Sequence, residues 1–108
     1  MYIAMNRFTV AAENEADFEA LWLARDSQLT ELPGFVEFHM LKGPEDNGLR
    51  LYASHTVWAS EEDFRAWTRS EQFRAAHARA GTTRKLHEGA PRFEGFAAIQ
   101  HIAARSAA

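Results

Sequence analysis

The chain has 108 residues, twelve basic and fifteen acidic, a formal net charge of -3 and no cysteine. These values exclude a disulfide framework and thiolate chemistry, and the interspersed charges argue against a nucleic-acid or anionic-lipid binder. A chain of this length without a linker predicts a single domain, with a core over residues 1–102 and a frayed tail over 103–108.

The first predicted element is a strand over residues 2–10. Alternation places one set of side chains on each face, Tyr2, Ala4, Asn6, Phe8 and Val10 on one and Ile3, Met5, Arg7 and Thr9 on the other. Asn6 is unusual, because asparagine is depleted in strand interiors and its amide needs hydrogen-bond partners. A backbone contact to a neighbouring loop and a bound ligand both satisfy that need.

A helix is predicted to begin near Asn14, which is a good capping residue. It is predicted to continue to residues 32–34, where a proline and a glycine end it. The apolar stripe of this helix consists of Phe18, Leu21, Trp22 and Leu29. Residues 35–42 and 49–58 then have the composition of two strands, and the run of turn-forming residues over 43–48 predicts a hairpin between them.

Ser60 and Asp63 resemble a capping box, so a second helix should begin there and carry Phe64 and Trp67 inward. Ser70 can cap a further helical segment, over residues 71–80, whose apolar face consists of Phe73, Ala76, His77 and Ala80. We expect a loop over residues 81–91 and a last strand over 92–102.

The order strand, helix, strand, strand, helix, strand predicts a ferredoxin-like α+β fold, an antiparallel sheet with the helices on one face. No helix remains to cover the other face. Its predicted large side chains are Ile3, Met5, Tyr52, Trp58 and residues of the last strand. We therefore expect sheet-to-sheet pairing of two chains, as a two-fold homodimer with the form of an α/β-barrel.

Three residues are candidates for chemistry: Asn6, Trp67 and His77. A lone histidine or tryptophan on an apolar helix face is more often a core residue than a ligand. The predicted topology, however, brings all three to one cleft between sheet and helices. An apolar cleft with one imidazole and one amide suits a flat iron-binding cofactor such as haem, with His77 as the single axial ligand and the other axial position open to dioxygen.

Three stretches resemble the haem-degrading monooxygenases of the IsdG type, within the antibiotic biosynthesis monooxygenase superfamily. They are residues 4–8 around Asn6, residues 56–60, and the run EEDFRAWTRSEQFRAAH over 61–77. The resemblance implies that His77 binds haem iron, that Asn6 hydrogen-bonds the distal oxygen species and that Trp67 crowds a buckled porphyrin. It also suggests that Trp22 lines the pocket.

Such an enzyme uses haem as both cofactor and substrate, takes electrons from an external donor such as a reductase, and releases iron and an open-chain tetrapyrrole. Two alternatives remain open. One is a cofactor-free monooxygenase acting on polyphenolic substrates, in which His77 is a base or a bystander. The other is a haem-binding carrier or sensor that never degrades its ligand.

The remaining histidines, His39, His55, His87 and His101, have no metal-ligand spacing and are interpreted as surface or packing residues. His87 is a candidate for an accidental second axial ligand. Arg84 and Lys85 could meet haem propionates, although a solvated loop is the preferred interpretation. Without a signal-peptide pattern or a long apolar run, we expect a cytoplasmic protein with no membrane or nucleic-acid partner.

Overall fold

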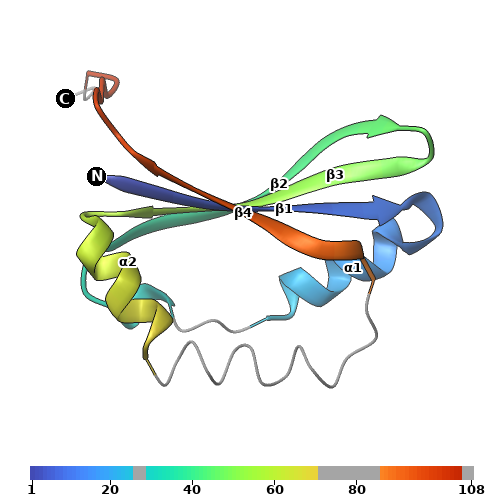
Figure 1. The fold of residues 1–108 in the computed structure, drawn as a ribbon, viewed down its shortest axis with the longest axis horizontal. Helices are drawn as coiled ribbons and strands as arrows, with labels where there is room; N and C mark the ends of the chain where they lie inside the picture. The colour runs from blue at the N-terminus through green and yellow to red at the C-terminus, as the bar shows by residue number, and fades with distance from the viewer. Residues whose placement is uncertain (26–28, 71–85, 106–108) are drawn as a thin grey trace.

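The computed structural model describes residues 1–25, 29–70 and 86–105. Its four-stranded sheet has the order β2-β3-β1-β4, with every pairing antiparallel. The strands are β1 (Tyr2–Ala11), β2 (Phe35–Asp46), β3 (Leu49–Trp58) and β4 (Glu88–Ala97). Helices α1 (Glu15–Leu23) and α2 (Glu61–Thr68) lie on the same side of the sheet (Figure 1). The predicted ferredoxin-like fold is confirmed.

The hairpin turn is shorter than the sequence predicted. Only Asn47 and Gly48 form it, with φ values of 52° and 79°, which are typical of the Asn-Gly turns that match the twist of a hairpin. Strand β2 therefore continues to Asp46. Pro44 is tolerated there because β2 is an edge strand whose register shifts between Lys42 and Glu45.

The prediction that Tyr52 and Trp58 face away from the helices is wrong. Tyr52 pairs with Phe8 and Trp58 pairs with Tyr2, and paired residues share a face of the sheet. Both rings lie on the helix side and are 1% and 0% exposed. The physical reason is packing: the ring of Phe18 on α1 lies 4.6 Å from that of Tyr52, so the large rings of β3 fill the space beneath the helices.

The face opposite the helices, which we call the open face, keeps Ile3 and Met5 as predicted. The cross-strand register adds Leu41, Leu51, Val57 and Phe96 to it. The last strand begins and ends earlier than predicted, at Glu88 and Ala97. Gly89 and Pro91 suggested a loop, but β4 is an edge strand, where both residues are compatible with pairing.

The sequence predicted the start of α2 correctly, but it predicted the end of α1 wrongly. Ser60 caps α2 as predicted, because its hydroxyl accepts from the Asp63 N–H at 3.2 Å. Helix α1 ends at Leu23 rather than near residue 32. After its last residue, the Arg25 N–H donates to the carbonyl of Trp22, three residues earlier, which is the hydrogen bond of a 3₁₀ turn. Leu29 belongs instead to a short 3₁₀ helix (Leu29–Glu31), and it is nevertheless buried.

An ionic network fixes α1 to the sheet. Lys42 Nζ lies 2.8 Å from Glu19 Oε2, and the Tyr52 hydroxyl donates to the same oxygen. Hydrogen bonds from Lys42 and Tyr52 lower the pKa of the Glu19 carboxyl. Burial, together with the bond to Glu19, raises the pKa of Tyr52. The network therefore favours an ionised Glu19 and a neutral Tyr52.

We expect Glu19→Gln to lower the free energy of unfolding slightly at pH 7, since exposed ion pairs contribute little. The folded-state pKa of Glu19 lies below its unfolded value of about 4.3. Its contribution is therefore complete above that value and is lost as the pH falls through the folded-state pKa. Thermal unfolding of Glu19→Gln and the wild type should converge near pH 2.5, with the exposed Glu13→Gln as the control. A deficit that persists at that pH contradicts the assignment.

Candidate functional site

A cavity lies between the sheet and the two helices, where the sequence predicted it. Its lining residues are Ala4, Asn6, Trp22, Arg25, Leu29, Phe38, Ser54, Thr56, Phe64 and Trp67. Strands β1, β2 and β3 supply one wall, and the helix layer supplies the other. The structure thus brings together three of the four predicted site residues: Asn6, Trp22 and Trp67.

Asn6 stands in the centre of the sheet wall, opposite Ser54 of β3 and Phe93 of β4. Its side chain is half-buried, and among the described residues its amide has no hydrogen-bond partner. The loop contact that was the alternative explanation for Asn6 is therefore not found in this part of the chain. The Asn6 amide is therefore available to a group bound in the cavity.

Trp67 is held by a layer of aromatic rings. It stacks on the fully buried Trp58 with ring centroids 5.5 Å apart and planes inclined at 29°. Phe64 lies 6.0 Å from Trp67 and stacks in turn on Phe93 at 5.7 Å. Because packed cores leave few voids, this layer gives Trp67 a rigid backing.

Trp22 and Arg25 form the end of the cavity near α1. The Trp22 ring stacks on Phe38 of β2 at 6.2 Å, and the Arg25 guanidinium carbon lies 4.1 Å from the Trp22 ring centroid. Loss of solvent lowers the pKa of Arg25. Arg25 was not predicted from the sequence, although its position three residues after Trp22 places it on the same side of a helix.

Ser54 and Thr56 also line the cavity and were not predicted. Thr56 donates its hydroxyl to the Ala4 carbonyl at 3.1 Å, while Ser54 is buried directly beside Asn6 in the register. The sequence contained the signal for both residues, because every second residue of a strand lies on the same face, and Ser54 and Thr56 therefore share a face with Tyr52 and Trp58. Assigning those two aromatics to the correct face would have found them.

His77, the fourth predicted site residue, lies outside the described residues, as do Phe73, Arg84 and Lys85. The described His87 does not line the cavity. Its Nδ1 is 2.8 Å from the Gly89 carbonyl and its ring packs against Phe8. Within residues 1–25, 29–70 and 86–105, no group of three or more metal-ligating side chains is found. The helices in these ranges include none long and apolar enough to cross a membrane.

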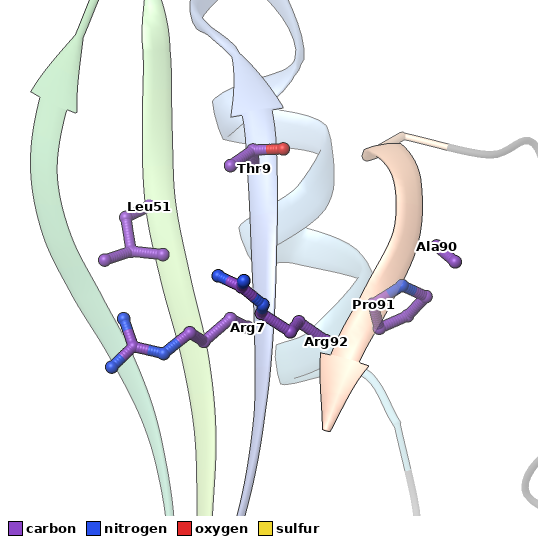
Figure 2. A pocket seen from close by; sticks show the side chains of 6 residues that line it. All are labelled: Arg7, Thr9, Leu51, Ala90, Pro91 and Arg92. Carbon is purple, nitrogen blue, oxygen red and sulfur yellow. The ribbon is translucent and has the colours of Figure 1, made fainter. Parts of the chain in front are cut away.

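A second hollow, of about 450 Å³, lies on the open face. Figure 2 shows its lining: Arg7 and Thr9 from β1, Leu51 from β3, and Ala90, Pro91 and Arg92 from β4. Arg7 and Arg92 are directly opposite each other, and Glu94 pairs with Arg7. This hollow has no aromatic wall and is separated from Asn6 by the sheet. We therefore assign the candidate site to the cavity beside the helices.

The antiparallel sheet, the two helices on one face and the aromatic cavity between them define a ferredoxin-like α+β protein with an internal cavity. Residues 1–79 match the antibiotic biosynthesis monooxygenase family. The chain belongs to that family, which confirms the resemblance noted in the sequence.

A staphylobilin-producing haem oxygenase of Staphylococcus haemolyticus is 31% identical over 77 residues, which are 71% of this chain and 73% of that protein. Haem-degrading monooxygenases of Listeria and Bacillus match over 50% of their own length. The fold resembles that of the haem degrader MhuD of Mycobacterium tuberculosis with two haems bound (TM-score 0.72, 24% identity, 95% and 100% coverage of this chain and that one). It also resembles SnoaB of Streptomyces nogalater, a cofactor-independent oxygenase (TM-score 0.65, 25% identity, 93% and 94% coverage).

Proposed function

We propose that this protein is a haem-degrading monooxygenase, which binds haem as substrate and cofactor and opens the porphyrin to release iron and an open-chain tetrapyrrole. The observation that carries this proposal is the aromatic cavity in which the Asn6 amide has no protein partner among the described residues. Similarity to a staphylobilin-producing haem oxygenase supports the choice of ligand.

The residues of the cavity fit a haem. Trp22, Phe64 and Trp67 offer ring surfaces to a flat macrocycle, and Asn6 offers a hydrogen-bond donor beside its face. His77, outside the described residues, would bind the haem iron in this proposal. Bound haem supplies the activation of dioxygen, with electrons from an external donor. The chain's own contribution is orientation of the ring, pressure on it from Trp67 and exclusion of water.

The cavity has to widen for this function. Its volume is about 100 Å³, whereas small-molecule sites usually measure about 300–1,000 Å³. We therefore expect the walls to move apart on binding. The stacked pair of Trp22 and Phe38 joins α1 to β2, and separation of these two rings is one way to open the cavity.

We further propose that the active form is a cytoplasmic homodimer that pairs through the open face. Ile3, Met5, Leu41 and Phe96 share that face, and burial of such apolar side chains favours association. Sedimentation of the purified protein tests this point, and a monomer at micromolar concentration contradicts it.

Haem titration tests the proposed function directly. We expect a shifted Soret band at one equivalent of haem and its loss or displacement in His77→Ala, because a single imidazole is the proposed iron ligand. His87→Ala is the matched control, since the Nδ1 of His87 already contacts Gly89. No spectral change in the wild type contradicts the proposal and favours the cofactor-free alternative, for which the fold of SnoaB is a precedent.

A reductant added in air separates the enzyme from a haem carrier. With catalase present to remove peroxide, we expect the Soret band to disappear and a tetrapyrrole product and free iron to form. A stable Soret band under these conditions supports a carrier.

A further inference from the structure

A pair of histidines from neighbouring strands lies on the open face, on the other side of the sheet from the cavity. His39 of β2 and His55 of β3 are directly opposite each other in the register, and their ring centroids are 5.5 Å apart. Glu37 precedes His39 by two residues and shares its face, and the Glu37 Oε2 is 3.5 Å from the His39 Nε2. Strand pairing therefore brings together two imidazoles that are far apart in the sequence, with a carboxylate beside one of them.

The spacings in this cluster are those of ligands that share one metal ion. Two atoms bound to a tetrahedral zinc ion, at about 2.0–2.2 Å each, lie about 3.3–3.5 Å from each other. Two imidazoles bound to the same ion have their ring centroids about 5.1–5.4 Å apart by the same geometry. The observed spacings of 3.5 Å and 5.5 Å are close to these values. At 3.5 Å, the contact between His39 and Glu37 is longer than a good hydrogen bond.

The Nδ1 atom of His55 is a second, independent indication. It is buried and has no hydrogen-bond partner in the described part of the chain, whereas buried polar atoms are normally partnered. A neutral imidazole carries a lone pair on one of its two nitrogens. Coordination of a cation by that nitrogen satisfies the lone pair without a protein donor.

Binding requires small rotations of the side chains. Glu37, His39 and His55 do not yet surround one point in the described conformation. The side chains of His39 and Glu37 are 50% and 54% exposed and lie on the edge strand β2, which leaves them room to turn. Glu37 and His55 occupy diagonal positions on neighbouring strands, and residues so placed are within reach of each other when their side chains are long.

We propose that Glu37, His39 and His55 form a binding site for a divalent transition-metal ion, with Zn²⁺ as the best fit. Imidazole and carboxylate are ligands that zinc takes, and three protein ligands leave the fourth tetrahedral position to water. The sheet separates this site from Asn6 and the cavity. The metal site is therefore independent of the proposed haem-degrading function.

Zinc titration of the full chain, free of any histidine tag, tests the site. Affinities are measured by competition with a chromophoric chelator for the wild type, His39→Ala, Glu37→Gln and the control His101→Ala, whose side chain is exposed. We expect one zinc ion per chain in the wild type and in the control. Loss of an outer partner of a metal ligand already costs about 10- to 100-fold in affinity, so removal of a ligand in His39→Ala should cost about 100-fold or more. Glu37→Gln should lie between the control and His39→Ala.

Thermal unfolding provides the second readout. Zinc should raise the Tm of the wild type, because a ligand that binds the folded state stabilises it, and it should leave the Tm of His39→Ala unchanged. Without zinc, the two proteins should unfold at similar temperatures, since the His39 side chain is half-exposed on an edge strand. This comparison separates loss of the site from loss of the fold.

Three outcomes overturn the inference. One is a wild type that binds no zinc. Another is equal zinc affinity of the wild type and His39→Ala, which assigns the cluster to an ordinary surface contact. The third is zinc binding that is lost in His77→Ala and retained in His39→Ala, which places the ion elsewhere in the chain. Haem titration of His39→Ala should match that of the wild type, so failure of the haem function and failure of the metal site are distinguishable.

Discussion

Asn6→Ala is expected to bind haem nearly as tightly as the wild type and to open the ring about 100-fold more slowly. On the proposed function, binding would depend on the aromatic walls and the iron ligand, whereas the Asn6 amide would donate a hydrogen bond to a group that gains charge during ring opening. Loss of one preorganised donor of this kind typically costs about 10²–10³ in rate. The measurement is the single-turnover decay of the Soret band after addition of a reductant.

Ser54→Ala provides the matched control for Asn6. Ser54 is buried, lines the same cavity and is the direct cross-strand partner of Asn6. Its replacement removes a smaller polar group, a hydroxyl, at a neighbouring position, and we expect ring opening to change by less than about fivefold. Undiminished degradation by Asn6→Ala, or equal losses in the two variants, is incompatible with the role assigned to Asn6.

Trp58→Ala should cause a large loss of stability. Trp58 is fully buried and packs against the rings of Phe35, Phe64 and Trp67. Truncation of such a residue costs about 3–5 kcal/mol, against a total stability of about 5–15 kcal/mol for a domain. The free energy of unfolding from denaturant titration measures the effect, and a loss below about 1 kcal/mol contradicts this account.

Two further variants serve as comparisons for the stability of Trp58→Ala. Leu23→Ala removes a side chain that is 88% exposed, and it should change the stability by no more than about 0.5 kcal/mol. Phe18→Ala removes a buried ring that packs on Phe8 and Tyr52, with a cost similar to that of Trp58→Ala. Trp58→Ala removes the backing of Trp67, and Phe18→Ala removes packing against Trp22. Both variants should therefore weaken haem binding in the fraction that remains folded, and Leu23→Ala should not.

The fold was predictable from the sequence because its signals were local. Strict alternation located the first strand, and Ser60 with its capping bond located the start of α2. Asn6 was recognisable because a polar amide interrupted an apolar face. These features depend on neighbouring residues only.

The errors arose where distant contacts decide the structure. Which face of β3 Tyr52 and Trp58 occupy is fixed by pairing with β1, more than forty residues earlier in the chain. The ends of β2 and β4 depend on their being edge strands, where Pro44 and Pro91 are tolerated. Arg25 remained unrecognised because its place at the cavity depends on where α1 ends and how α1 packs on the sheet.

All three tryptophans of the chain lie at the cavity or directly behind it: Trp22 and Trp67 line it, and Trp58 stacks on Trp67. Indole emission overlaps the near-ultraviolet absorption of porphyrins, and energy transfer over such short distances is efficient. Occupation of the cavity should therefore quench nearly the entire intrinsic fluorescence. The protein thus carries a built-in optical reporter, and ligand entry and product departure can be followed in real time without an attached dye.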